Sequence, residues 1–312
     1  MSDRRATREA LGETLIELAN EGIAVVAVDA DLSGSTTTAR FGTAFPERFF
    51  NVGIAEQNMI GVAAGLAVEG MVPFTGSFAV FATGRAYDQV RNSVCYSGLD
   101  VKLAPTHAGI TVGPDGGSHQ MLEDIALMRV LPGMRVLVPA DYVAAKAAIR
   151  LAATTPGPFY VRLGRAGVPV LYGDDHRFEL DRVRVLREGI HITLAACGVM
   201  VEQALVAAEQ LALDGIHAEV LDVATIKPLD AQGIAASARK TGAVVTCEEH
   251  SVIGGLGSAV AEALGELAPV PLARIGVRDV FGTSGEPAEL MAHFGLTGAD
   301  IARAARRLLE RR

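Results

Sequence analysis

The most informative motif of this sequence reads Asn51-Val52-Gly53-Ile54-Ala55-Glu56-Gln57-Asn58-Met59, and small residues continue it through Gly61 and Gly65. The motif predicts a helix whose first turn contains Glu56, where unpaired backbone N–H groups and the helix dipole favour a negative charge. Another backbone or a flat ligand can approach this helix closely, because several of its residues have little or no side chain, namely Gly53, Ala55, Gly61, Ala63, Ala64 and Gly65. Glu56 is therefore the first candidate functional residue.

Composition and charge limit the classes of protein to which the chain can belong. Its 312 residues are about twice the usual size of one domain, so we expect two domains. Half of the residues are hydrophobic and none is Trp, which is typical of an α/β protein with a large core. The net charge is −8 and no Lys/Arg-rich run occurs, so the footprint of a nucleic-acid or anionic-membrane binder is absent.

The cysteines and the amino terminus indicate the compartment. Cys95, Cys197 and Cys247 are odd in number and far apart, with neither disulfide nor metal-ligand spacing, so we expect buried thiols and no metal ligands. The first ten residues are charged rather than apolar, and no uninterrupted apolar run reaches about 18 residues. These features predict a cytoplasmic protein.

Apolar segments of strand length alternate with segments of helical periodicity along most of the chain. This alternation predicts an α/β fold of two domains, each a mainly parallel sheet flanked by helices. Gly, Pro and charged residues interrupt the pattern near the middle of the chain and predict a linker. The expected ranges are 1–170 for the first domain, 171–188 for the linker and 189–312 for the second domain.

Two polar segments directly follow predicted strands, which is where open α/β sheets bind ligands. The first covers residues 29–36, and the second is a long, glycine-rich loop over residues 107–120. A long loop that forgoes regular backbone pairing inside a compact domain is typical of a functional site. The side chains that we single out in these segments are Ser35, His107, Asp115 and His119.

Four motifs, taken in order, resemble the transketolase family of thiamine diphosphate enzymes. The resemblance covers nearly the whole chain and extends over the family's pyrimidine-binding and carboxy-terminal domains. The motifs are Gly-Ile-Ala-Glu-Gln at 53–57, Arg-Ala-Tyr-Asp-Gln-Val at 85–90, Gly-x-Asp-Gly-Gly-Ser-His-Gln at 113–120, and Glu-Glu-His at 248–250 followed by Gly-Gly-Leu-Gly at 254–257.

One part of the family pattern has no counterpart here. Full-length transketolases begin with a diphosphate-binding domain, in which Gly-Asp-Gly and a downstream Asn hold Mg²⁺ and the diphosphate of the cofactor. The chain therefore resembles the carboxy-terminal half of a split transketolase. The resemblance implies an N-terminal partner subunit that carries the diphosphate-binding domain and Mg²⁺, and assembly of two copies of each chain into a heterotetramer.

The resemblance also assigns cofactor-binding residues. Glu56 matches the catalytic Glu that hydrogen-bonds a ring nitrogen of the aminopyrimidine and assists loss of a weakly acidic C–H proton. Phe78 and Phe81 match the aromatic residues that stack on this ring, and Phe81 is the better candidate of the two. Gly84 stands where several transketolases carry a third aromatic residue, which alters the expected shape of the pocket.

Residues of the glycine-rich loop match substrate contacts of the family. His119 matches a residue that contacts hydroxyl or carbonyl oxygens near the reacting carbons, so it is both a catalytic and a substrate-binding candidate. Asp115 matches a residue that binds a hydroxyl of the donor or acceptor. His107 matches a position that helps to bind the acceptor's phosphate. Gly117-Ser118 replaces the Pro-Thr of many members, so the loop can be set differently here.

The remaining substrate-binding candidates lie at the phosphate end of the expected site. Ser35 and Arg165 match phosphate contacts of the family, and the planar guanidinium of Arg suits phosphate oxygens. Arg162 is close enough in sequence to compete with Arg165, and the two alternatives stay open.

Three functions are compatible with these residues. The leading hypothesis is a transketolase subunit that, with its partner, moves a two-carbon ketol unit from a ketose phosphate to an aldose acceptor. A second is the beta subunit of a 2-oxoacid dehydrogenase or an enzyme similar to deoxyxylulose-phosphate synthase. A third is a non-catalytic transketolase-like binding subunit. The sugar substrate stays open among pentose phosphates, branched or modified sugar phosphates and sulfonated sugars.

Overall fold

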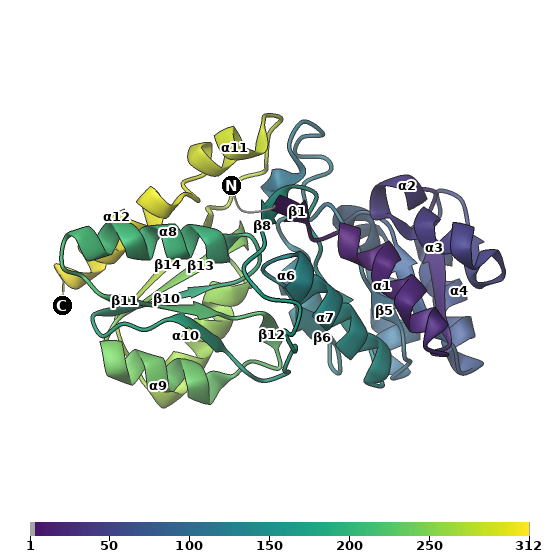
Figure 1. The fold of residues 1–312 in the computed structure, drawn as a ribbon, viewed down its shortest axis with the longest axis horizontal. Coiled ribbons are helices and arrows are strands. Elements are labelled where there is room, and N and C mark those ends of the chain that lie inside the picture. The colour runs from purple at the N-terminus through teal and green to yellow at the C-terminus, as the bar shows by residue number, and fades with distance from the viewer. Residues whose placement is uncertain (1–3, 312) are drawn as a thin grey trace.

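The computed structural model describes residues 4–311 and contains two α/β units that lie side by side along its longest axis (Figure 1). The first unit is built on a seven-stranded sheet of order β12-β6-β7-β5-β4-β2-β3, and the second on a five-stranded sheet of order β14-β13-β10-β11-β9. Neighbouring strands are parallel except for β12 with β6 and β9 with β11. The predicted fold class is confirmed.

Helices cover both faces of the seven-stranded sheet. On one face Leu11, Leu15 and Leu18 of α1 are fully buried, at helical spacing, together with the apolar side of α7. On the other face Met59, Ile60 and Ala63 of α4 pack with η2, η3 and α6. The strands are β2 (Val25–Asp29), β3 (Phe49–Asn51), β4 (Val72–Gly76), β5 (Lys102–Leu103), β6 (Arg135–Leu137), β7 (Phe159–Val161) and β12 (Thr225–Lys227). The helices are α1 (Glu9–Asn20), α2 (Ser33–Thr36), α3 (Thr38–Ala44), η1 (Pro46–Arg48), α4 (Glu56–Val68), η2 (Val80–Arg85), α5 (Tyr87–Gln89), η3 (Val90–Tyr96), η4 (Ile110–Val112), α6 (Asp124–Arg129) and α7 (Tyr142–Thr154).

The second unit has the same layered design, with α8 and α12 on one face of its sheet and α9 and α10 on the other (Figure 1). Its central strands, β10 and β11, are buried along their whole length. The strands are β9 (Arg184–Arg187), β10 (Ile192–Ala196), β11 (Ala218–Asp222), β13 (Val244–Ser251) and β14 (Leu272–Val277). The helices are α8 (Met200–Leu213), α9 (Ala231–Thr241), α10 (Leu256–Leu267), α11 (Pro287–His293) and α12 (Gly298–Leu309).

Two strand pairings lie near the boundary between the units (Figure 1). Strand β1 (Arg4–Ala6) pairs with β8 (Gly167–Pro169), and β12 returns from the second half of the chain to pair with β6 of the first sheet. Strand β9 lies inside the range 171–188, where its Leu186 packs on the core of the second unit. We therefore propose that the linker ends before Arg184.

Candidate functional site

The candidate site lies at the carboxyl edge of the first sheet, where four neighbouring strands end. Strands β2, β4, β5 and β7 lie next to one another and run parallel. Strand β2 is followed by the turn with Ser35, β4 by Phe78, β5 by His107 and β7 by Arg165. Parallel pairing thus gathers candidates that are far apart in the sequence.

Glu56 is the first residue of α4, as its motif predicts, and only 2% of it is exposed. Gly53 lies three residues before the helix and has a positive φ of 74°, a conformation that favours glycine. Arg85 donates a hydrogen bond from Nη1 to Oε2 of Glu56 over 2.9 Å. A buried carboxylate is therefore balanced by a guanidinium whose side chain is half exposed.

Phe78 and Phe81 form an aromatic wall next to this ion pair. Their ring centroids are 6.1 Å apart and their planes differ by 12°, and the guanidinium of Arg85 lies 4.7 Å from the Phe81 centroid. Phe81 and Arg85 belong to the π-helical segment η2, and such segments are frequent at functional sites. Gly84, in the same segment, has open space where a side chain would project.

His107 is buried and packs face to face on Phe78, with ring centroids 3.8 Å apart. Its backbone is left-handed, with φ 59°, and Nδ1 lies 2.7 Å from Oγ1 of Thr106. Burial, followed by the charges of Arg8 and Arg165, lowers the pKa of His107 to about 3. The imidazole is therefore neutral at physiological pH and can accept a hydrogen bond.

His119, in the glycine-rich loop (residues 107–120), also contacts the aromatic wall. Its ring stands edge-on to Phe81, with centroids 5.5 Å apart, and to Phe78, at 6.4 Å. Its Nδ1 lies 2.9 Å from Oγ of Ser118. Asp115, in the same loop, is exposed and accepts a hydrogen bond from Nη1 of Arg165 over 3.2 Å.

Arg8 is a site residue that the sequence did not single out. Its Nη1 donates to the carbonyl of Ser35 over 2.9 Å and lies 3.4 Å from Nε2 of His107. Within residues 4–311 its buried Nε atom has no hydrogen-bond partner. Arg8 also occupies the N-cap of α1, where the helix dipole disfavours a cation. A positive charge at this unfavourable position is the feature of the sequence that could have marked Arg8 as a functional candidate.

The two arginines that follow β7 have different surroundings. Arg162 is buried, and its Nε and Nη2 atoms donate to both carboxylate oxygens of Asp124 over 2.7 and 3.2 Å. Arg165 is more exposed and holds the glycine-rich loop through the carbonyl of Val112, 2.7 Å away, and through Asp115. Of the two open alternatives, only Arg165 extends a guanidinium toward the other candidates.

Six of the eight predicted site residues therefore belong to one continuous row of contacts. The row runs from Glu56 through Arg85 to Phe81, and then through the aromatic and imidazole rings to Arg8 and Ser35. Arg165 and Asp115 flank it. A carboxylate and a flat apolar surface form one end, and the cationic guanidinium of Arg8 and the neutral imidazole of His107 form the other.

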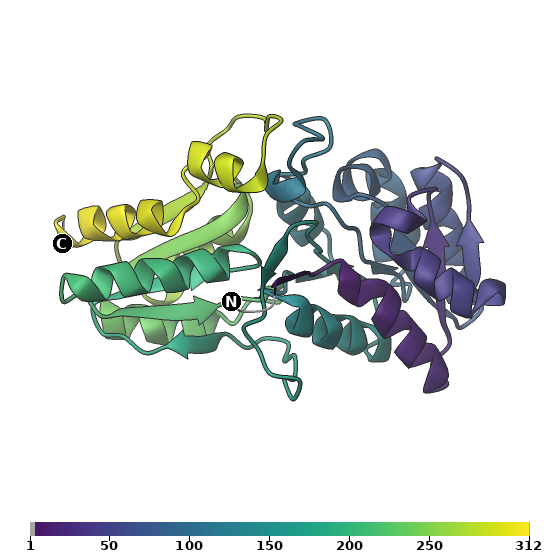
Figure 2. The ribbon, with the colours of Figure 1, turned by 45° about the horizontal axis from the view of Figure 1, so that its top comes forward.

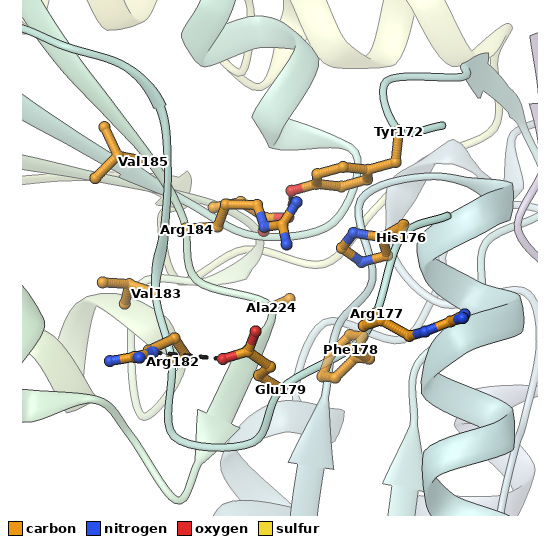
Figure 3. Close-up of a pocket in the computed structure, with 11 residues that line it drawn as sticks. Tyr172, His176, Arg177, Phe178, Glu179, Arg182, Val183, Arg184, Val185 and Ala224 are labelled. Carbon is orange, nitrogen blue, oxygen red and sulfur yellow. Dashed lines mark hydrogen bonds and ion pairs between the residues drawn. The ribbon is translucent and has the colours of Figure 1, made fainter. Parts of the chain in front are cut away.

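The structure also has a cavity of about 260 Å³ beside the linker, and none of the predicted site residues lines it (Figure 3). Tyr172 and His176 stack there with ring centroids 4.1 Å apart, and Tyr172 donates from its hydroxyl to Oδ2 of Asp222 over 2.6 Å. Burial raises the pKa of Asp222 to about 7. Arg182 pairs with Glu179 at the cavity rim.

Among residues 4–311, no group of three or more His, Cys, Asp or Glu side chains is placed to hold a metal ion. In the same range, no helix has the length and apolar character that crossing a membrane requires.

Comparison with known proteins gives consistent matches over the whole chain. The family described as "Transketolase, pyrimidine binding domain" matches residues 3–170, and "Transketolase, C-terminal domain" matches residues 181–301. A "Putative transketolase C-terminal section" of Methanocaldococcus jannaschii is 50% identical over 96% of this chain and 95% of its own length. The "6-deoxy-6-sulfo-D-fructose transketolase subunit SqwH" of a Clostridium species is 48% identical over 98% and 95%. A solved "Split gene transketolase, inactive beta4 tetramer" is 53% identical, with a TM-score of 0.90 over 98% of both chains.

Proposed function

Because this chain belongs to the transketolase family, we propose that it is the C-terminal subunit of a two-subunit transketolase. The enzyme transfers a two-carbon ketol unit from a ketose phosphate to an aldose or aldose phosphate acceptor. The observation that carries the proposal is the continuous row of contacts, which places a carboxylate and an aromatic wall beside donors for sugar and phosphate oxygens.

The Glu56 end of the row fits the aminopyrimidine of thiamine diphosphate, the cofactor that the family implies. Glu56 is a buried carboxyl group, Phe81 is a half-buried ring joined to it through Arg85, and the space beside Gly84 is open. When bound, the cofactor supplies a nucleophilic carbon for cleavage beside a ketose carbonyl. In our proposal Glu56 shares a proton with a ring nitrogen, and Phe78 and Phe81 hold the ring by stacking.

The other end of the row fits a phosphorylated sugar. Arg8 offers a buried N–H that has no partner within residues 4–311, and Arg165 adds a second guanidinium. Neutral His107 lies between them and supplies a polar atom without adding charge. We propose that these residues and Ser35 bind the phosphate, while Asp115 and His119 contact the hydroxyl and carbonyl oxygens near the reacting carbons.

The proposed enzyme is active only with an N-terminal subunit, which contributes the diphosphate-binding domain and Mg²⁺. We propose two copies of each chain in a cytoplasmic heterotetramer. Two facts support this: the similar Clostridium protein is named as a subunit, and the similar solved tetramer, made of one kind of chain by its title, is described as inactive. Because this chain covers almost the full length of both relatives, the comparison is between whole subunits.

The relatives favour a transketolase over the alternatives. Neither a 2-oxoacid dehydrogenase beta subunit nor a non-catalytic binding subunit is supported by their names, and the chain is similar to transketolase sections along its whole length. The similar Clostridium protein acts, by its name, on a sulfonated sugar. Sulfonated ketoses should therefore be screened as donors for this chain together with ketose phosphates.

The test is to assay the purified pair of subunits with thiamine diphosphate, Mg²⁺, an aldose acceptor and a panel of ketose phosphates and sulfonated ketoses. We expect consumption of one ketose together with formation of a new ketose from the acceptor. Consumption of pyruvate instead would favour the dehydrogenase or synthase alternative. A pair that transfers no ketol unit from any of these sugars would contradict the proposal.

A further inference from the structure

We propose that Glu249, a residue of the carboxy-terminal unit, is a positioning residue that fixes the glycine-rich loop and so sets the places of Asp115 and His119 in the site. The inference rests on the proposed function, to which it adds a role for the second unit. Glu249 touches none of the groups that we expect to contact the sugar, so it acts through the loop.

The contact between Glu249 and the loop is direct and buried. The backbone N–H of Thr111 donates to Oε1 of Glu249 over 2.6 Å, and only 3% of Glu249 is exposed. Gly109 precedes this bond with a positive φ of 80°, and a side chain at Gly109 would collide with the Glu249 carboxylate. Glycine at this position thus allows the loop backbone to close onto the carboxylate.

Glu249 is itself held from the first unit by Arg162. Nη2 of Arg162 donates to the Glu249 carbonyl over 3.0 Å, and Nη1 lies 3.7 Å from Oε2 of Glu249. Arg162 is anchored by Asp124, which also accepts a hydrogen bond from Tyr160 over 2.6 Å. Burial raises the pKa of Glu249, and the charge of Arg162 opposes that shift. The Glu249 carboxylate is therefore held in place at the contact between the two units by Thr111 and Arg162.

The second unit holds the far end of the same loop as well. Gln120 donates from Nε2 to the carbonyl of Thr283 over 2.9 Å, and Gly117 lies so close to the Gly282 carbonyl that a side chain there would clash. Helix α11 lies beside η4, which contains Thr111, as both views show (Figures 1 and 2). Asp115 and His119 thus lie between two loop positions, Thr111 and Gln120, that are each hydrogen-bonded to the second unit.

Loss of the Glu249 contact should affect the binding of substrate and not the binding of the cofactor. Loss of the Glu249 contact frees the loop but leaves Glu56, Phe81 and Arg85 in place, because none of them contacts Glu249. Substrate binding and the chemical step should therefore suffer, while binding of the cofactor should not. Displacement of a substrate-binding group by about 1 Å can cost about 100-fold in rate, so the expected effect is large enough to measure.

The test compares Glu249→Ala, Glu249→Gln and the surface control Glu262→Gln in the reconstituted pair. Glu262 is an exposed residue of α10, and its carboxylate pairs with Arg129, the last residue of α6. We expect Glu249→Ala to raise the KM for the ketose donor and to lower kcat/KM about 10- to 100-fold, with unchanged affinity for thiamine diphosphate. Glu249→Gln keeps an acceptor for the Thr111 N–H, so it should retain most of the activity, and the control should match the wild type.

Hydrogen exchange of the peptide over residues 107–120 supplies a readout that does not depend on activity. We expect faster exchange of this peptide in Glu249→Ala than in Glu249→Gln. If Glu249→Ala does not fold, the comparison of Glu249→Gln with the wild type remains, and Gln120→Leu serves as a second test of the loop, because it removes the bond to Thr283 together with the bonds to Ile110 and Gly113. Unchanged exchange together with an unchanged donor KM would overturn the inference, as would a parallel loss of cofactor binding. A wild-type pair without ketol transfer would overturn the proposed function, and the exchange data would still decide the role of Glu249.

Discussion

Arg85 links Glu56 to Phe81, because its Nη1 atom lies 2.9 Å from Oε2 of Glu56 while its guanidinium lies 4.7 Å from the centre of the Phe81 ring. The two groups that we propose for binding the aminopyrimidine are thus held by one half-exposed side chain. Arg85 keeps the buried carboxylate of Glu56 paired, and removal of such a partner from a buried charge is costly. The Glu56–Arg85 ion pair and the Phe81 ring therefore depend on each other for their positions.

The first prediction concerns Glu56. Replacing Glu56 by Gln keeps the size of the side chain but removes its ability to exchange a proton, so kcat of the reconstituted pair should fall about 10²- to 10⁴-fold. Steady-state kinetics with saturating cofactor measures the loss. The matched control is Glu69→Gln, at the exposed end of the same helix, which should keep wild-type activity. Equal activity of the two variants would remove Glu56 from the reaction.

The second prediction concerns the phosphate end of the site. Arg8→Met and Arg165→Met should each raise the KM of a phosphorylated ketose about 10- to 100-fold, because each removes a charge-assisted hydrogen bond worth about 1.5–3 kcal/mol. Both variants should lower kcat/KM less for the corresponding unphosphorylated ketose than for the phosphorylated one. Arg165→Met also removes the bonds to Val112 and Asp115, so it should affect the unphosphorylated ketose more than Arg8→Met does. A similar loss with both sugars would show that the arginines support the fold and not phosphate binding.

The third prediction follows from the lowered pKa of His107. The folded protein keeps His107 neutral down to about pH 3, whereas the unfolded chain takes up a proton near pH 6.5. The unfolded state therefore binds more protons below pH 6.5, and stability falls as the pH falls. Between pH 7.5 and 5.5 this site should cost about 1.4 kcal/mol of unfolding free energy. Urea unfolding of the wild type and of His107→Asn at both pH values should show this difference, and parallel pH profiles would contradict it.

The fourth prediction concerns Asp222 beside the linker cavity. Its pKa is raised to about 7, so the folded state favours the protonated acid, and its ionisation costs stability as the pH rises from about 4 to about 7. Asp222→Asn can still accept the Tyr172 hydrogen bond. The stability of this variant relative to the wild type should therefore increase between pH 5 and pH 7.5. Asp214→Asn, on the surface, is the control, and an advantage that is the same at both pH values would contradict the prediction.

Element positions were predictable wherever one periodicity continued over a long segment. Helix α8 is regular from Met200 to Leu213, and β2, which ends at Asp29 before the first predicted polar segment, is buried throughout. Residues 80–96 form two π-helical segments, η2 and η3, around the short α5, and the apolar periodicity does not encode this departure from a regular α-helix. Strand β12 was not predicted, since its pairing with β6 is set by contacts far apart in the sequence.

Only part of the candidate site could be predicted from the sequence. Motifs located Glu56, Phe81 and His119, and parallel pairing then brought them together. Arg8 was missed because a single Arg beside Glu9 reads as a helix surface charge, and only the fold places it against His107. The role that we propose for Glu249 depends on contacts made 138 residues away in the chain, and no local pattern encodes such a contact.

The most direct test of the split active site is calorimetric titration of thiamine diphosphate, with Mg²⁺, into this chain alone, into the N-terminal subunit alone and into the pair. The account predicts binding by the pair, with an affinity that Glu56→Gln weakens, and no measurable binding by this chain alone. Tight binding by this chain alone would mean that its own residues hold the diphosphate, and that result would contradict the division of the site between two subunits.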